Sequence, residues 1–190
     1  MKIKALAAIT KKRKSIVLYD GPEDDNQWLS DGTGVYPLLK MPYLNEYNIF
    51  ALFDIPEGKT GDYFFKKQEF PTALNFDNGD ELENKLKEEK ILISKDGRTL
   101  KPFQTSKGLI FIDVQYLKPI SDELELRYYE RFTKGKGDVY IVIKNGMEVI
   151  ALILPFLCID DDFVLQMEEI TRMCKVALDG KKKEGIINAN

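Results

Sequence analysis

The chain has 190 residues, of which 44% are hydrophobic and 31% are charged, and its net charge is −3. This length and composition are typical of one globular domain and exclude an intrinsically disordered chain. A pI near 5.3 excludes a global basic field that would hold nucleic acid, although it is compatible with a local basic patch.

The sequence contains no histidine and only two cysteines, Cys158 and Cys174. Serine–histidine and cysteine–histidine catalysis, histidine-ligated zinc and four-cysteine zinc sites are therefore excluded. Both cysteines occupy apolar positions, so we expect buried thiols without a disulfide, as in a reducing, cytoplasmic compartment. The longest apolar run, residues 149–159, is too short to span a bilayer as a helix, and we expect no membrane partner.

Three segments share one sequence pattern, in which short runs of strand-forming residues alternate with glycine-containing turns. They lie near residues 15–55, 91–120 and 123–178. Asn145-Gly146 between two apolar runs is the strongest hairpin signal, because tight turns need residues that adopt positive φ. The pattern fits either an internal repeat or an ordinary series of antiparallel β-meanders. A repeat predicts that Gly34 and Gly108 occupy equivalent turns in segments that superpose.

Two or three helices complete the predicted α+β fold. The clearest helix follows Asp160, carries apolar residues at helical spacing and is predicted to end at Gly180. We expect its apolar face to pack on the apolar strand at residues 149–154. Asn45 is predicted to cap a second helix, because its side chain can accept a hydrogen bond from a free backbone N–H group.

The remaining boundaries follow from local periodicity. Residues 80–89 are predicted to form a thin, highly charged helix with its leucines on one side. Residues 123–128 alternate with period two and also fit a helix, and the glycine turn that follows them favours a strand. We expect one α+β domain over residues 1–180 and a flexible tail over residues 181–190.

Carboxylates are the residue type that is left for metal-dependent catalysis. Asp160-Asp161-Asp162, together with Asp54, Asp77 or Asp113, is a candidate metal cluster. Three adjacent side chains point in different directions, however, and an acidic run suits a helix N-terminus, so we interpret the run as a helix cap. We therefore predict no catalytic residue, no metal ligand and no cofactor-binding residue.

Two features are candidates for binding a macromolecule. The first is a basic stretch, and its residues are Lys11, Lys12, Arg13 and Lys14. It could contact phosphate groups, although a solvated basic face explains it as well. The second feature is a pair of aromatic residues, Trp28 and Tyr43, which are candidates for contact with a partner. Trp28 lies beside turn residues, so we expect it to be partly exposed.

A pattern of short motifs extends over residues 15–178. It consists of Ile16-Val17-Leu18-Tyr19-Asp20, Trp28-Leu29-Ser30-Asp31-Gly32 with Tyr36-Pro37, Asp54-Ile55-Pro56, Gly97-Arg98-Thr99-Leu100-Lys101-Pro102 with Gln104-Thr105, Gly108-Leu109-Ile110-Phe111-Ile112 with Tyr116-Leu117, Tyr129-Glu130-Arg131, and Phe163-Val164. In these motifs the chain resembles a family of uncharacterised proteins encoded by prophages and mobile elements of Gram-positive gut bacteria. The resemblance implies a cytoplasmic protein of a bacterial host, encoded among replication and recombination genes, and it implies no activity.

We therefore expect a non-enzymatic accessory protein of a phage or mobile element that binds another macromolecule, foremost a protein. One alternative is a clamp-like, nucleic-acid-associated replication or recombination accessory. It requires the basic stretch to share a face with cations such as Arg98 and Lys101. The second alternative is a carboxylate-dependent metal enzyme, which requires the aspartates named above to converge in a pocket.

Overall fold

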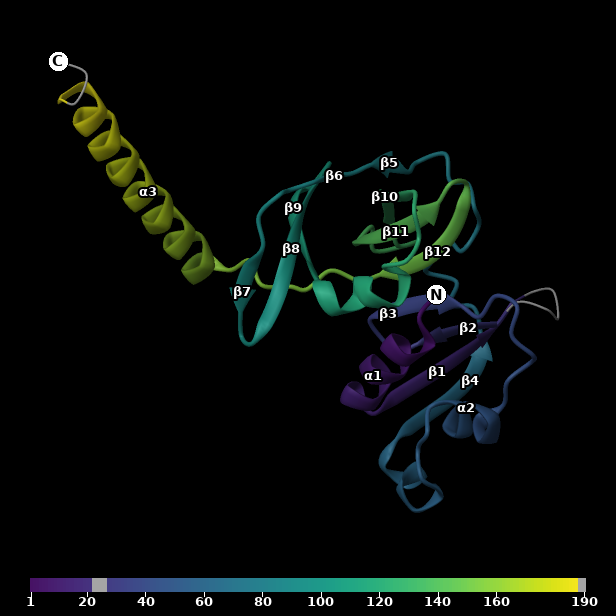
Figure 1. Ribbon diagram of the computed structural model, residues 1–190. Helices are drawn as coiled ribbons and strands as arrows, with labels where there is room; N and C mark the ends of the chain where they lie inside the picture. The colour runs from purple at the N-terminus through teal and green to yellow at the C-terminus, as the bar shows by residue number, and fades with distance from the viewer. Residues whose placement is uncertain (22–26, 188–190) are drawn as a thin grey trace. The chain divides into compact units, whose positions relative to one another are not determined.

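The structure is a computed structural model that describes residues 1–21 and 27–187, with side chains up to residue 181. The chain divides into two units, Met1–Phe156 and Leu157–Asn190, which are described separately. The α+β class is confirmed, since helices combine with strands that pair almost entirely antiparallel (Figure 1).

An eight-stranded sheet is the main element of the first unit. Its strands are, in spatial order, β4 (Phe64–Glu69), β1 (Ser15–Asp20), β2 (Gln27–Ser30), β3 (Gly34–Pro37), β12 (Glu148–Ile153), β11 (Val139–Asn145), β10 (Leu126–Phe132) and β5 (Asn84–Lys85). All neighbouring strands are antiparallel except β1 and β4, which run parallel. The predicted hairpin at Asn145-Gly146 is confirmed, with Gly146 at φ 63° between β11 and β12. The strand predicted over residues 123–128 is confirmed from Leu126, where β10 begins, whereas residues 123–125 lie outside the strand.

A smaller sheet is built around β8. It contains β6 (Lys87–Glu88), β7 (Ile93–Lys95), β8 (Arg98–Thr105) and β9 (Gly108–Asp113). β8 pairs antiparallel with each of the other three strands. Gly34 and Gly108 each open the third strand of a meander, but these meanders lie in different sheets. The expectation that the two segments superpose as repeats is therefore wrong.

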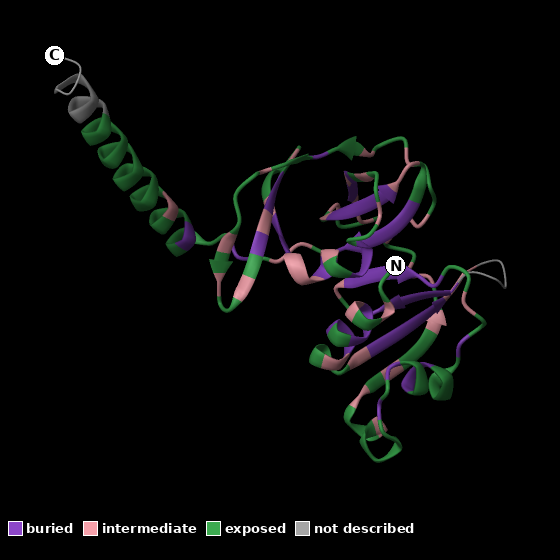
Figure 2. Cartoon of the chain, in the orientation of Figure 1, coloured by how far each residue is buried: buried purple, intermediate pink, exposed green. Residues whose placement is uncertain are grey.

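Helices cover one face of the large sheet. They are α1 (Ile3–Arg13), α2 (Glu46–Leu52) and the 3₁₀ helix η2 (Val114–Ile120). A further 3₁₀ helix, η1 (Glu57–Asp62), precedes β4 and has no buried residue. Leu6 of α1 and Ile49 of α2 are fully buried in one core cluster with Ile16, Leu18 and Ile141 of the sheet (Figure 2). The predicted cap at the start of α2 is confirmed, because Asn45 Oδ1 accepts a hydrogen bond from the backbone N of Asn48 at 2.9 Å. The N-terminal helix α1 was not expected from the sequence.

The residues that alternate along these strands with those just named point to the face of the sheet opposite the helices. Val17 and Tyr19 of β1, and Tyr140 and Val142 of β11, form a second buried cluster there. Both faces of the sheet are therefore covered, which explains why these strands carry nearly continuous apolar runs.

The second unit consists of a short segment and the helix α3 (Asp161–Ile187). The helix continues through Gly180 to Ile187, so its predicted end is wrong, and the flexible tail over residues 181–190 stays a prediction. A glycine within a helix costs only about 1 kcal/mol and does not by itself end it. Residues 188–190 of the predicted tail lie outside the described residues. The predicted packing of this helix on β12 stays a prediction, because the two lie in different units. Cys174 was expected to be buried, yet it is exposed on α3, and the two cysteines form no disulfide.

Within residues 1–21 and 27–187, no helix combines the length and the apolar character that crossing a membrane requires.

Candidate binding site

The strap, which we define as residues 70–83, connects β4 to β5. These two strands form opposite edges of the eight-stranded sheet, so the strap crosses a face of the sheet. Seven strand spacings amount to about 34 Å. A chain of about fourteen residues covers that distance when it is extended, whereas a helix of the same length covers only about 21 Å. The predicted helix at residues 80–89 is therefore wrong: the segment contains turns, β5 and β6.

Aromatic rings attach the first half of the strap to the sheet. Phe70 and Phe76 stack on each other with ring centroids 4.0 Å apart. Trp28 of β2 meets both rings edge-on, at 5.2 Å from Phe76 and 6.1 Å from Phe70. Tyr19 of β1 lies 6.2 Å from Phe76. Edge-to-face contacts of this kind add about 0.5–1.5 kcal/mol per pair to the gain from burial.

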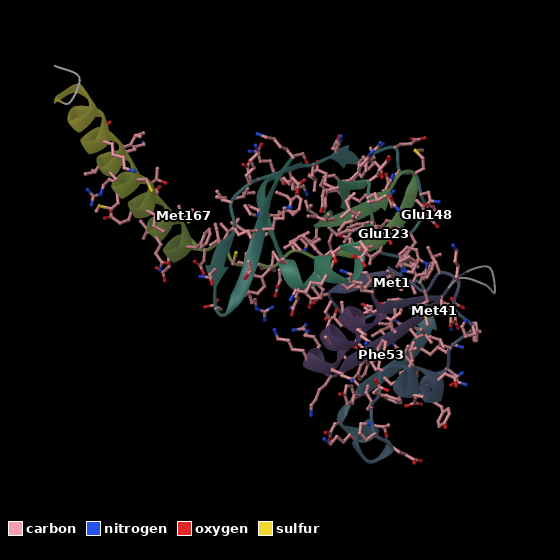
Figure 3. The ribbon with its side chains drawn as sticks, viewed as in Figure 1. Met1, Met41, Phe53, Glu123, Glu148 and Met167 are labelled. Atoms are coloured by element: carbon pink, nitrogen blue, oxygen red, sulfur yellow. The ribbon has the colours of Figure 1, made fainter. Side chains whose placement is uncertain are left out.

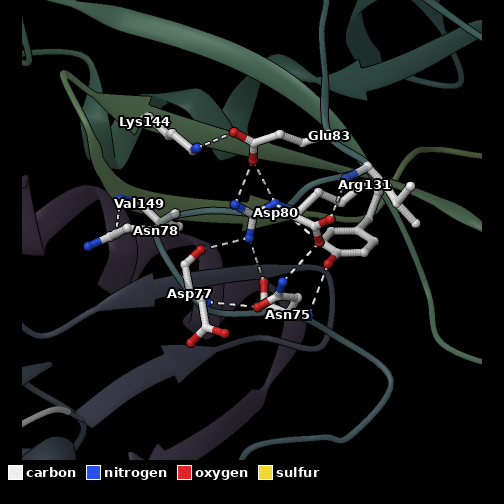
Figure 4. A network of polar contacts seen from close by, with 10 residues as sticks. Asn75, Asp77, Asn78, Asp80, Glu83, Arg131, Lys144 and Val149 are labelled. Atoms are coloured by element: carbon white, nitrogen blue, oxygen red, sulfur yellow. Dashed lines mark hydrogen bonds and ion pairs between the residues drawn. The ribbon is translucent and has the colours of Figure 1, made fainter.

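Arg131 attaches the second half of the strap. Its side chain is fully buried, and its Nε and Nη2 donate hydrogen bonds to Glu83 Oε2 at 2.9 and 2.6 Å (Figure 4). Its Nη1 donates to the backbone oxygens of Asn75 and Asp77 at 3.1 and 2.8 Å. A buried guanidinium is tolerated where its donors are paired, and these bonds use all three of its nitrogen atoms. One arginine of β10 thus holds points along the strap from residue 75 to residue 83.

Other polar groups complete this network. Lys144 of β11 forms an ion pair with the second oxygen of Glu83. Asp80 accepts hydrogen bonds from the backbone N of Leu82 and from Asn75 Nδ2, both at 2.9 Å. Desolvation acts to raise the pKa of Asp80, but these bonds and the charge of Arg131 together lower it below its ordinary value. No buried side-chain nitrogen or oxygen in the described part of the chain lacks a hydrogen-bond partner.

A cavity of about 560 Å³ opens between the strap and the ends of β2, β3 and β12. The rings of Trp28, Phe70 and Phe76 form part of its wall. Its other lining residues are Pro37, Leu39, Pro71, Thr72, Leu74, Asn75, Asp77, Asn78, Lys134, Glu148 and Val149. Several of the polar lining residues are exposed to solvent. Glu148, at the start of β12, is one of them (Figure 3). An aromatic wall with a few charged and amide groups is typical of a ligand-binding pocket.

The two aromatic residues that the sequence suggested for partner contact, Trp28 and Tyr43, differ in exposure. Trp28 is only 8% exposed, so the expectation of partial exposure is wrong, because the two strap phenylalanines cover its ring. Tyr43 is 52% exposed. Its hydroxyl accepts a hydrogen bond from Lys67 Nζ at 2.6 Å, and this bond, with the charge of Asp20, raises the pKa of Lys67.

The predicted basic stretch forms the end of α1, and contacts within the chain engage most of it. Lys12 Nζ donates to Gln115 Oε1 at 3.3 Å. Arg13 Nε lies 3.8 Å from the buried carboxylate of Asp31, and Lys14 Nζ lies 3.3 Å from the exposed carboxylate of Asp62. A helix C-terminus favours cations through its dipole, which accounts for their position without a ligand.

The further cations that the nucleic-acid alternative requires are divided between two faces. Arg98 lies 3.6 Å from Asp113 Oδ2, and Gln115 links the same carboxylate to Lys12. Lys101 forms an ion pair with Glu88 instead. Residues 98 and 101 of β8 are an odd number of positions apart, so they point to opposite faces of the strand. The nucleic-acid alternative stays a prediction.

The aspartates proposed as metal ligands serve as caps or lie in turns. Asp113 caps η2 by accepting a hydrogen bond from the backbone N of Gln115. Asp160 Oδ1 accepts one from the backbone N of Phe163 at 2.8 Å, which confirms the cap of α3. Asp54 is exposed and has a positive φ. Within the residues that the structure describes, no three acidic or cysteine side chains group to hold a metal ion.

Sequence reasoning missed the strap network. Its central members are Arg131, Glu83 and Asn75. One signal was present: Glu130 and Arg131 are adjacent charged residues in a strand rich in aromatic residues, so their side chains point to opposite faces of β10. A charge on a face that is buried requires a partner elsewhere in the chain.

Comparison with protein-family models, with curated proteins and with solved structures finds no match for this chain. The resemblance to proteins of prophages and mobile elements stays a prediction. Function is therefore inferred from the cavity and from the residues around it.

Proposed function

We propose that this protein is a non-catalytic binding protein that holds a segment of a partner protein in the cavity beside the strap. The observation that carries the proposal is the aromatic wall of Trp28, Phe70 and Phe76 in an open cavity of about 560 Å³. Aromatic pockets of this kind receive the one or two anchoring side chains that provide most of the binding energy of a protein interface.

The charges at the cavity indicate what the partner segment carries. Asp77 and Glu148 are acidic, whereas Lys134 is the only basic residue among the described residues that line the cavity. An apolar or aromatic anchor next to a lysine or arginine fits this arrangement, because the anchor contacts the rings and the cation lies near the carboxylates. Arg131 holds the backbone at Asp77, since the backbone oxygen of Asp77 accepts a hydrogen bond from Arg131 Nη1.

Trp28 provides a direct measure of occupancy, because it is the single tryptophan of the chain. Peptides selected from a random displayed library on the wild-type protein are titrated while tryptophan emission is recorded. We expect selected peptides to combine an aromatic or large aliphatic residue with a basic neighbour, and to shift the emission at saturation. Enrichment of no peptide, or binding without a change in emission, would contradict the proposal.

Two substitutions on adjacent strap residues locate the site. Thr72 and Ala73 are both exposed, but only Thr72 lines the cavity. Thr72→Arg is expected to weaken binding of the selected peptides at least tenfold, whereas Ala73→Arg is expected to leave it unchanged. Equal effects of the two substitutions would place the binding surface elsewhere. Binding of a small molecule alone, with no peptide bound, would assign the cavity to a metabolite instead of a protein.

A further inference from the structure

The sequence contains two Asn-Gly pairs, Asn78-Gly79 and Asn145-Gly146, and the structure gives them different surroundings. An asparagine that precedes glycine is prone to modify itself, because glycine has no side chain to keep its backbone nitrogen away from the neighbouring amide carbon. Asn78 and Gly79 are exposed on the strap, and Asn78 lines the cavity. Asn145 and Gly146 are half-buried at the hairpin between β11 and β12.

The amide group of Asn78 is held at its oxygen only. Asn78 Oδ1 accepts a hydrogen bond from the backbone N of Val149 at 2.8 Å (Figure 4). A backbone N–H group can only donate, so the oxygen is the atom that faces it, while Nδ2 bonds to no residue that the structure describes. A donor at Oδ1 draws electron density from Cγ and stabilises the negative charge that develops on the oxygen when a nucleophile adds to Cγ.

The backbone nitrogen of Gly79 is accessible as the nucleophile. It donates to no backbone or side-chain group in the described part of the chain, and nothing lies within 4 Å of the place where a Cβ would stand. Asn145 differs, because its Nδ2 donates to Glu123 Oε2 at 2.9 Å and its strand is paired on both sides. These contacts oppose the rotation that would bring its Cγ to the nitrogen of Gly146.

We propose that Asn78 is a site of spontaneous deamidation. The backbone nitrogen of Gly79 loses its proton to hydroxide and attacks Asn78 Cγ, so that a new N–Cγ bond forms. The Cγ–Nδ2 bond breaks, and Nδ2 takes up a proton and leaves as ammonia. Water then opens the resulting five-membered succinimide at either of its carbonyl carbons. The product at position 78 is aspartate or isoaspartate, and the only co-reactant consumed is water.

The modification changes the charge of the cavity. It adds a third carboxylate to a wall that already carries Asp77 and Glu148. The peptides selected for the cavity are expected to carry a basic residue, so the modified form is expected to bind them several times more tightly. This consequence, unlike the modification itself, rests on the function proposed for the cavity.

Peptide mapping by mass spectrometry tests the site on the intact, folded chain. The protein is kept in mildly alkaline buffer, and replacement of the amide NH₂ by OH is followed at both asparagines. We expect residue 78 to react at least tenfold faster than residue 145 in the folded protein. In urea, where neither backbone is held, the two are expected to react at similar rates.

Gly79→Ala is the matched variant, because it hinders the nucleophile and leaves Asn78 itself unchanged. Gly79 is not in the left-handed region and has open space around it, so the fold accommodates alanine. The reaction at residue 78 is expected to slow at least tenfold, and that at residue 145 to stay the same. Equal rates at the two asparagines in the folded chain, or no effect of Gly79→Ala, would overturn the proposal. Unchanged peptide affinity of the modified form would contradict the function proposed for the cavity, while the peptide map would still establish the modification.

Discussion

The substitution Arg131→Met removes the central group of the strap network while it keeps a side chain of similar length. It leaves the carboxylate of Glu83, which is largely buried, with Lys144 as its remaining cationic partner. It also removes the donor to the backbone oxygens of Asn75 and Asp77. Breaking a buried pair by removing one partner typically costs about 3–5 kcal/mol. Since the lysine still compensates part of the charge, we expect a loss near the lower end, about 3 kcal/mol.

Urea denaturation followed by circular dichroism measures this loss as a change in the free energy of unfolding. Arg127→Met is the matched control on the same strand, because Arg127 is half exposed and lies 3.7 Å from the exposed Glu125. We expect the control to change stability by less than about 0.5 kcal/mol. The double variant Arg131→Met with Glu83→Gln should lose less than the sum of the single changes, by roughly 1–3 kcal/mol. A loss below about 1 kcal/mol for Arg131→Met would refute the reasoning that this arginine holds the strap.

Four further outcomes are expected. Phe53→Ala in the main core should cost about 3–5 kcal/mol of unfolding free energy, and a loss below 1 kcal/mol would mean that Phe53 does not pack as the structure shows. Asn45→Ala should cost about 1 kcal/mol through loss of the α2 cap, measured by the same titration. Burial, with the nearby charge of Asp31, raises the pKa of Tyr116 to about 12. An alkaline absorbance titration should therefore show a tyrosine that ionises only near pH 12. The contribution of Tyr116 to stability should disappear as pH rises from 10 through 12. The pKa of Asp80 is lowered from 3.8, so its contribution is present at neutral pH and disappears as pH falls below about 4; Asp80→Asn should therefore flatten the acid limb of the stability curve, and an unchanged limb would contradict this assignment.

Local sequence signals predicted the elements that depend on neighbouring residues. A turn residue predicted the hairpin at Gly146, and a capping side chain predicted the cap at Asn45. An alternation of side chains predicted the strand that the structure begins at Leu126. In each case the deciding interaction lies within a few positions of the residue itself.

The strap and its network could not be predicted in this way. Leu82 and Leu86 were expected to share one side of a helix, yet Leu82 is 74% exposed and Leu86 is buried. The path of this segment depends on the order of strands that are far apart in the sequence, since β5 pairs with β10 more than forty residues later. Arg131 and Glu83 meet only after the sheet has formed, so no local pattern relates them.

The two edges of the large sheet limit how this protein can associate. β5, at one edge, is only two residues long, and β4, at the other, carries the exposed lysines Lys66 and Lys67. Short edge strands and edge lysines oppose the addition of a strand from another molecule, which is the usual route to sheet aggregation. Backbone pairing at these edges would therefore contribute little to recognition. A partner has to be selected by side-chain chemistry, and substitutions that lengthen β5 or neutralise the β4 lysines are the ones expected to convert the protein into an aggregating chain.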